Sequence, residues 1–296
     1  MDTTHCTLCP RKCAADRAAG GRGFCGAGAD IVIGRYSLHH WEEPCISGSR
    51  GSGTVFFSHC TLRCVYCQNY AISTNMQGRK ISQSELCEIF LKLQEDGAHN
   101  INLVTPTHFI DKILPALDAA KSAGLHIPVV YNTSGYERTE TLRMLKGYID
   151  IYLPDFKYWR SEYAKKYSSA PDYPSVAMAA IEEMAQQSLP QVFENGLMKR
   201  GLIVRHLLLP GLLYDAKKII DYLYSSYGNR ITLSIMSQYT PLEQVADIPP
   251  LNTTVGKREY ELLCDYAASI GVTNAYIQDS AAAKESFIPD FFDDKI

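Results

Sequence analysis

Six short apolar segments divide residues 54–237 into units of roughly 30 residues. They cover residues 54–59, 101–106, 127–132, 149–156, 201–211 and 231–237. Most are runs of apolar residues, which are typical of strands buried on both faces of a parallel sheet. Amphipathic stretches of helical length lie between them. Because parallel neighbours need a crossover connection, this alternation predicts an α/β fold made of right-handed strand–helix–strand units.

Helix boundary signals agree with this interpretation. Ser82 and Glu85 form a capping-box pattern at the start of a stretch that ends at Gly97, and two later stretches end at Gly124 and Gly271. We therefore favour a partial (β/α)6 TIM-like barrel, and a doubly wound open sheet is the alternative. In both arrangements ligands bind at the carboxyl ends of the strands.

The first 50 residues differ from the rest of the chain. They are rich in Gly and Cys and show little periodicity. We therefore predict two parts, a Cys-rich N-terminal metal-binding extension over residues 1–50 and a barrel domain over residues 51–296.

Composition and the N-terminus limit where such a chain works and what it binds. The opening "MDTTHCTLCPRKC" has no apolar leader, and the sequence has no run of 18 apolar residues. We therefore expect a cytoplasmic protein that does not enter a membrane. The net charge of −3 argues against binding of nucleic acid.

Ten cysteines need an explanation in a reducing compartment, where disulfides are rare. Seven of them fall in two groups, within residues 6–25 and 60–67, and this grouping indicates metal binding. The second group, in "SHCTLRCVYCQN" (58–69), directly follows the first strand and holds Cys60, Cys64 and Cys67. A disulfide would use only two of these thiols, and a zinc site usually has four ligands. Three thiolates suit a [4Fe–4S] cluster with one iron left open.

The spacing C-x3-C-x2-C after the first strand of a βα repeat, with Tyr66 before the last cysteine, resembles the radical S-adenosylmethionine (SAM) superfamily. The resemblance implies that Cys60, Cys64 and Cys67 bind a [4Fe–4S] cluster whose open iron binds the methionine moiety of SAM. It also implies an oxidoreductase in which the reduced cluster cleaves SAM to a 5′-deoxyadenosyl radical that abstracts hydrogen from a substrate. Zinc, or no metal, is the alternative for these cysteines.

The resemblance extends to the ends of the second and third strands. Family members usually carry a Gly-Gly-Glu stretch after the second strand, where this chain reads "VTPTHF" with Thr105 and Thr107. Both threonines are expected to contact the cofactor, and a helix N-cap at Thr107 is the alternative. Asn132 and Ser134 in "YNTSGYE" resemble residues directed at the ribose and methionine of SAM. A polar turn that ends the strand is the alternative.

Two later segments resemble glycyl-radical activating enzymes, and a third is expected to contact the cofactor or substrate. Asp155 and Lys157 in "LPDFKYW" resemble their Asp-x-Lys strand end, and two residues two apart on a strand point the same way. "VRHLLLPG" resembles their fifth strand, which implies that Arg205 reaches the cofactor, since a guanidinium pairs well with a carboxylate. Gln238, after the sixth strand, is placed beside the adenosine or the substrate. The chain thus resembles uncharacterised iron–sulfur proteins described as homologues of pyruvate formate-lyase-activating enzyme.

The other cysteine group can hold a second metal. Cys6, Cys9, Cys13 and Cys25 have the pattern C-x2-C-x3-C-x11-C, with glycines between the last two that let the backbone fold around sulfur. A structural zinc site and an auxiliary [4Fe–4S] cluster both fit this spacing. A reduced N-terminal arm without metal is the alternative.

Three functions are open at this point. The first is a radical SAM enzyme that activates a glycyl-radical enzyme, with a protein substrate and a flavodoxin- or ferredoxin-type electron donor. The second is a radical SAM enzyme that acts on a small molecule, a peptide or RNA. The third is an iron–sulfur or zinc binding module without catalysis. An electron carrier needs four protein ligands and no barrel, so the three-cysteine loop argues against the third function.

Overall fold

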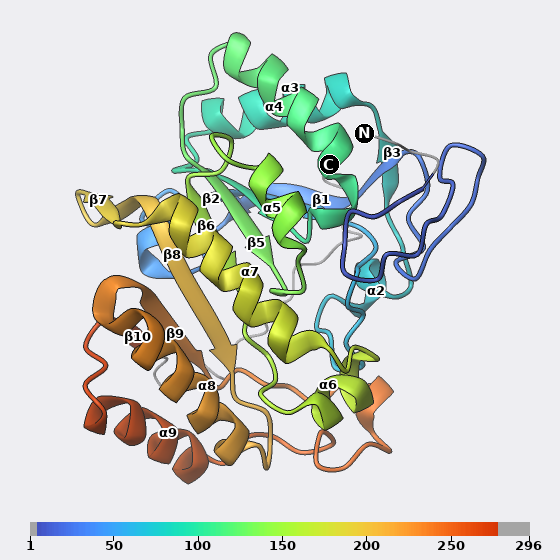
Figure 1. Ribbon diagram of the computed structural model, residues 1–296. Helices are drawn as coiled ribbons and strands as arrows, with labels where there is room; N and C mark the ends of the chain where they lie inside the picture. Colours follow the sequence, from blue (N-terminus) through green and yellow to red (C-terminus); the bar gives the residue numbers. More distant parts are fainter. Residues whose placement is uncertain (1–4, 278–296) are drawn as a thin grey trace.

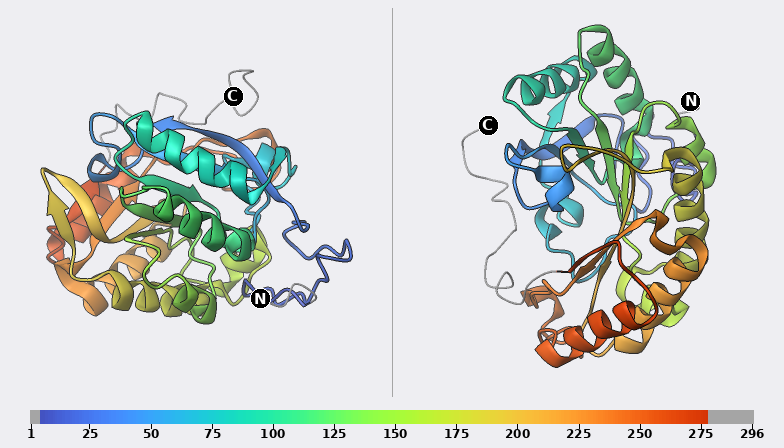
Figure 2. Two further views of the ribbon diagram at one scale, coloured as in Figure 1. Left: turned by 90° about the horizontal axis from the view of Figure 1, so that it is seen from above. Right: turned by 90° about the vertical axis from the view of Figure 1, so that its left-hand side faces the viewer.

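A curved sheet is the core of the computed structural model, which describes residues 5–277 (Figures 1 and 2). Seven strands run parallel in the order β2–β4–β5–β6–β8–β9–β10, while β1 and β3 add an antiparallel edge next to β2 and β7 pairs antiparallel with β8. The strands are β1 (Ile31–His39), β2 (Ser52–Phe57), β3 (Arg79–Ile81), β4 (Ile101–Val104), β5 (Val129–Thr133), β6 (Ile151–Pro154), β7 (Val192–Glu194), β8 (Leu197–Leu207), β9 (Thr232–Met236) and β10 (Ala275–Ile277).

Helices follow most of the parallel strands and cover the convex face of the sheet, as Figure 2 shows. The α-helices are α1 (Pro44–Ser47), α2 (Tyr70–Ser73), α3 (Gln83–Glu95), α4 (Ile110–Ser122), α5 (Thr139–Met144), α6 (Ser161–Ser168), α7 (Tyr173–Ser188), α8 (Leu213–Tyr227) and α9 (Lys257–Ser269). Short 3-10 helices span Thr107–Phe109, Gly228–Arg230 and Glu243–Val245. The predicted capping box is confirmed, because Ser82 accepts from the backbone of Glu85 and Glu85 accepts from that of Ser82.

The arrangement confirms the predicted partial TIM-like barrel. The six predicted strands correspond to β2, β4, β5, β6, β8 and β9, with boundaries that differ by a few residues. A doubly wound sheet would carry helices on both faces, whereas here the long helices lie outside the curve (Figure 2). The carboxyl ends of β2, β4, β5, β6, β8 and β9 therefore surround one mouth.

Side chains alternate across the strands, as the pleat requires. In β5, Val129 and Tyr131 join the main core under the helices, whereas Val130 belongs to a second cluster inside the curve. Helix α1 supplies Cys45 and Ile46 to this inner cluster and thus fills part of the barrel interior. Cys45 is therefore a packed core residue.

Sequence analysis missed several elements in the first 100 residues. Strand β1 lies within the predicted extension of residues 1–50, yet it pairs with β2 from Ile33 to His39 and continues the sheet. Its sequence, "IVIGRYSLH", has only three continuous apolar residues before Gly34 and is half-polar after it, so it did not stand out as a buried strand. The division at residue 50 stays a prediction, and β1 ties the second half of that region to the barrel.

Figure 1 shows the remaining N-terminal residues as irregular loops beside α2. We call residues 5–30 the N-terminal segment. Among the helices of residues 5–277, none combines the length and apolar character that crossing a membrane needs.

Candidate active site

The three-cysteine loop connects β2 to α2, and we call residues 58–69 the cluster loop. Cys60 and Cys64 are buried and Cys67 is half-buried. The backbone N–H groups of Leu62 and Arg63 donate to Cys60 Sγ at 3.4 and 3.5 Å. Burial, followed by the neighbouring thiols of Cys67 and Cys64, raises the pKa of the Cys60 thiol to about 12.

This donor set fits an iron–sulfur cluster. Thiolates are the usual ligands of iron in such clusters, and N–H donors around the sulfurs are the partners that stabilise them. Ser168 adds a third polar contact, because its hydroxyl donates to Cys64 Sγ at 3.1 Å. Three thiols from one loop, with hydrogen-bond donors already in place, can hold a four-iron cluster with one iron open.

A network of charged and amide side chains lies inside the barrel, at the carboxyl ends of β5, β6 and β8. We call Glu42, Asn132, Asp155, Lys157 and Arg205 the mouth network. The Arg205 guanidinium donates to Asp155 Oδ1 at 2.9 Å, to Glu42 Oε2 at 3.1 Å and to Asn132 Oδ1 at 2.6 Å. Lys157 Nζ donates to Asp155 Oδ2 at 2.7 Å. The side chains of its four charged members are 9–17% exposed, so the network is largely buried.

Electrostatics favour the ionised forms of Asp155, Lys157 and Arg205, whereas burial raises the pKa of Glu42. Burial opposes ionisation of Asp155, but Arg205 and Lys157 outweigh it and hold the pKa of Asp155 below its usual value. Burial likewise disfavours the Lys157 ammonium, but Asp155 and the thiols of Cys64 and Cys67 raise its pKa. Lys157 is therefore the member of the mouth network whose pKa responds to the cluster loop. Ammonium and guanidinium groups are usual partners of carboxylates, and here both are paired with carboxylates of the chain itself.

The comparison with protein families agrees with this geometry. The family model described as "Radical SAM superfamily" matches residues 54–234, which include the cluster loop and every strand of the mouth network. The chain belongs to the radical SAM superfamily. Membership implies a [4Fe–4S] cluster and SAM as cofactors, and the residues present fit both.

Individual relatives extend the comparison. The "Uncharacterized protein MJ0674" of Methanocaldococcus jannaschii is 28% identical over 284 residues, covering 92% of this chain and 77% of that protein. Among solved structures, SuiB of Streptococcus suis bound to precursor peptide SuiA is 15% identical with a TM-score of 0.47. The FeFe-hydrogenase maturase HydG of Carboxydothermus hydrogenoformans is 16% identical with the same TM-score. The match covers 74% and 73% of this chain, but 46% and 56% of SuiB and HydG, so it carries no argument about substrate.

Of the other predicted cofactor residues, Thr105, Ser134 and Gln238 lie near the mouth network or the cluster loop, whereas Thr107 does not. Thr105 has a left-handed backbone with φ 58°, and its N–H donates to the carbonyl oxygen of Asn132. The backbone oxygen of Gln238 accepts from Gln68 of the cluster loop at 3.1 Å, which places Gln238 beside that loop. Ser134 precedes Gly135, where an added Cβ would lie 2.2 Å from the carbonyl oxygen of Asp155. Their contacts with SAM stay predictions.

Thr107 faces a buried carboxyl group instead of the mouth network. Its hydroxyl donates to Glu137 Oε1 at 2.6 Å, and the hydroxyls of Thr133 and Tyr131 also donate to Glu137. Glu137 is 1% exposed, and this burial raises its pKa to about 7, against which the three hydroxyl donors act. Glu137 and its three hydroxyl donors together shape the turn after β5 from the outer side of the sheet.

Sequence reasoning missed Glu42, which contacts three strands. Its Oε1 accepts from Asn102 at 2.9 Å and from Asn132 at 3.2 Å, and its Oε2 accepts from Arg205. It comes from the connection between β1 and α1, within the region that was predicted to be a separate extension. Asn102, a polar residue inside the apolar segment "INLV", was the one available signal that a buried partner faced β4.

The four N-terminal cysteines of this radical SAM protein gather in the N-terminal segment. Cys9 and Cys25 are buried, and burial raises the pKa of Cys9 to about 12, with Cys25 and Cys6 adding to the rise. Cys13 lies against Gly23, where an added Cβ would be 2.1 Å from its Sγ. Glycine thus lets the chain pass close to this sulfur. Among residues 5–277, no three ligating side chains form a ready-made site for a single metal ion, so a metal here stays a prediction, as does the cluster at Cys60, Cys64 and Cys67.

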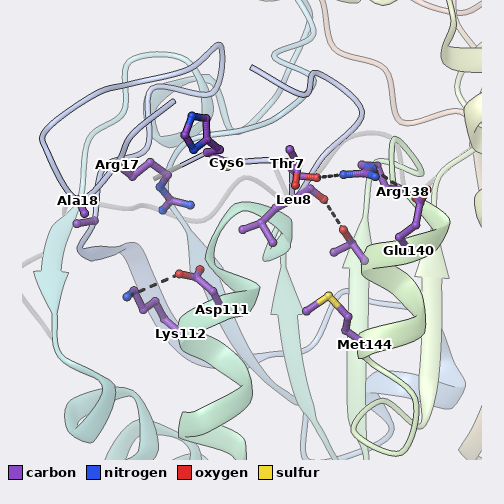
Figure 3. A pocket seen from close by; sticks show the side chains of 13 residues that line it. Cys6, Thr7, Leu8, Arg17, Ala18, Asp111, Lys112, Arg138, Glu140 and Met144 are labelled. Atoms are coloured by element: carbon purple, nitrogen blue, oxygen red, sulfur yellow. Dashed lines mark hydrogen bonds and ion pairs between the residues drawn. The ribbon is translucent and has the colours of Figure 1, made fainter. Parts of the chain in front are cut away.

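A cavity of 340 Å³ lies outside the barrel, between the N-terminal segment, α4 and α5 (Figure 3). Arg138 of the loop before α5 donates to the carbonyl oxygen of Thr7, and Thr141 donates to that of Leu8 at 2.8 Å. Cys6 lines the cavity together with Arg17 and other residues, but the mouth network does not. These contacts hold the N-terminal segment on the barrel and keep the cavity separate from the predicted SAM site.

Replacing Glu42 with Ala is expected to destabilise the fold strongly. The change removes one of the acceptors of Arg205, which keeps Asp155 and Asn132, and leaves two buried amides without their shared acceptor. A buried donor without a partner costs about 1–3 kcal/mol. The free energy of unfolding from urea titrations of the metal-free protein measures this loss. The matched control is Glu261→Ala, whose partner Lys257 is 73% exposed, and there we expect less than about 1 kcal/mol. Equal losses in both variants would contradict the role of Glu42.

Glu137 is expected to make stability depend on pH. In the folded chain Glu137 keeps its proton up to a pKa of about 7, whereas its ordinary pKa is 4.5. Between these two pH values the folded chain therefore binds more protons than the unfolded chain. Its contribution is therefore present at low pH and is lost as pH rises through 7. Relative to Glu137→Gln, the wild type should lose about 2–3 kcal/mol between about pH 5 and about pH 8. Parallel stability curves for the two proteins would refute this assignment.

Proposed function

We propose that this radical SAM enzyme abstracts a hydrogen atom from a glycine residue of a partner protein, as an activator of a glycyl-radical enzyme does. The observation that carries the proposal is the Asp155–Lys157 pair beside Arg205 at the barrel mouth. The cluster loop is near this pair, because the thiols of Cys64 and Cys67 raise the pKa of Lys157. This strand end is the feature that resembles activating enzymes. A loop of the partner would have to enter the barrel mouth to reach the site.

The protein's own groups hold and shield the cofactors in this proposal. Cys60, Cys64 and Cys67 bind the cluster, and the N–H groups of Leu62 and Arg63 support the first thiolate. When bound, the reduced cluster and SAM supply reductive cleavage of a carbon–sulfur bond and a radical that abstracts hydrogen. Lys157 and Arg205 bind the polar groups of SAM, and the buried barrel interior excludes water. No side chain needs to act as a general base.

A second candidate is a radical SAM enzyme that acts on a small molecule, a peptide or RNA. The segment after β4 favours it, because "VTPTHF" replaces the Gly-Gly-Glu stretch of family members and Thr107 is bound to Glu137. In both cases we propose a flavodoxin- or ferredoxin-type protein as the electron donor and a cytoplasmic location.

We also propose that Cys6, Cys9, Cys13 and Cys25 bind a second metal, either zinc or an auxiliary [4Fe–4S] cluster. Burial of Cys9 and Cys25 and the proximity of Cys6 support a shared site. A bound cation would displace the thiol protons and stabilise the thiolates that form, which offsets the raised pKa of Cys9 and Cys25.

Metal analysis separates these possibilities. Anaerobically reconstituted wild type should contain about four irons that are absent from a Cys60→Ala/Cys64→Ala/Cys67→Ala variant. A further four irons in both proteins would identify an auxiliary cluster, and one zinc in both would identify a structural site. A wild type that takes up no iron under these conditions would overturn the assignment of the cluster loop.

Turnover tests distinguish the substrate classes. With dithionite and SAM, the loaded wild type should release 5′-deoxyadenosine, and Arg205→Ala should release at least about tenfold less because it loses a charged contact of about 1.5–3 kcal/mol. A glycine-containing peptide should accelerate this release if the first proposal holds. Acceleration by RNA or a small metabolite, with no effect of any glycine peptide, would favour the second candidate.

A further inference from the structure

Arg11 lies between two cysteines of the N-terminal segment, yet its side chain reaches the cluster loop. Within residues 5–277, its guanidinium donates to four backbone carbonyl oxygens, two in the cluster loop and two at the end of α6. Nε donates to Thr61 at 3.1 Å, and Nη2 lies 3.5 Å from the oxygen of Leu62. The other acceptors are the oxygens of Ser168, at 2.8 Å, and Ser169.

The two loop carbonyls belong to the same peptide groups that donate to Cys60. The peptide between Thr61 and Leu62 presents its oxygen to Arg11 and its N–H to Cys60 Sγ at 3.4 Å. The next peptide does the same, with the oxygen of Leu62 toward Arg11 and the N–H of Arg63 toward Cys60 Sγ at 3.5 Å. Because a trans peptide is planar with C=O and N–H on opposite sides, fixing one end directs the other.

Other contacts hold Arg11 in this place. Its guanidinium stacks on the ring of Phe24 at 3.8 Å, and Arg63 donates to the carbonyl oxygen of Phe24 at 3.1 Å. Ser168, whose oxygen accepts from Arg11, donates through its hydroxyl to Cys64 Sγ at 3.1 Å. One guanidinium therefore organises hydrogen bonds to two of the three predicted ligands.

We propose that Arg11 is a positioning residue that orients the two N–H groups toward Cys60 and thereby raises the reduction potential of the cluster. Hydrogen bonds to ligand sulfurs stabilise the additional negative charge of the reduced state, and they are among the factors that set such potentials. The N-terminal segment thus tunes a centre that is bound by a different part of the chain. The proposal rests on the cluster ligands of the proposed function.

Three variants separate orientation from charge. Arg11→Ala removes the guanidinium, while Arg11→Lys keeps a positive charge but lacks the planar fork that binds two carbonyls at once. The matched control is Arg22→Ala, because Arg22 lies in the same segment and donates to Gly26, outside the cluster loop. Iron content is measured first in all four proteins.

The first readout is the reduction potential of the cluster, from a redox titration followed by electron paramagnetic resonance. The signal that is absent from the Cys60→Ala/Cys64→Ala/Cys67→Ala variant identifies this cluster. We expect a more negative potential in Arg11→Ala and in Arg11→Lys, and an unchanged one in Arg22→Ala. An unchanged potential in Arg11→Ala, or full restoration by Arg11→Lys, would overturn the positioning role.

The second readout needs no metal. In the metal-free chain, hydrogen exchange at the amides of Leu62 and Arg63 should be at least about tenfold faster in Arg11→Ala than in wild type, because the loop loses its support. Equal exchange would also refute the proposal. If the wild type failed to bind four irons, the ligand assignment would fail instead, and the exchange result would still decide what Arg11 does to the loop.

Discussion

The guanidinium group of Arg205 is the contact on which the barrel mouth depends. It joins Asp155 after β6, Asn132 of β5 and Glu42 of the β1–α1 connection, so three separate parts of the chain meet at one planar cation. A buried cation must be matched by buried acceptors, because an unpaired charge in the interior is very costly. The position of each neighbour is therefore tied to that of the others.

This constraint explains why the first 50 residues are not a simple appendage. Strand β1 extends the sheet, Glu42 supplies one of the two carboxylates of Arg205, and Arg11 supports the cluster loop from outside. Each contact places a residue from before β2 against a residue of the region that matches the radical SAM family model. The two groups of cysteines are consequently parts of one connected structure.

Much of the fold and part of the site follow from the sequence, for identifiable reasons. Buried parallel strands need continuous apolar segments, so β2, β4, β5, β6, β8 and β9 were recognisable. Cys60, Cys64 and Cys67 lie within eight residues, so their pattern was visible in one short segment of the sequence. Strand β1 was not recognisable, because its second half has polar positions and Gly34 interrupts its pattern.

The sequence by itself determined the barrel class, the three-cysteine loop and the strand ends that carry Asn132, Asp155 and Arg205. Only the tertiary structure decided that Glu42 completes the mouth network and that Arg11 reaches the loop, because both contacts join residues 50 or more positions apart. Local patterns report on neighbours along a strand or helix. A hydrogen bond between distant segments depends on how the chain closes, and nothing in the local sequence around either partner records it.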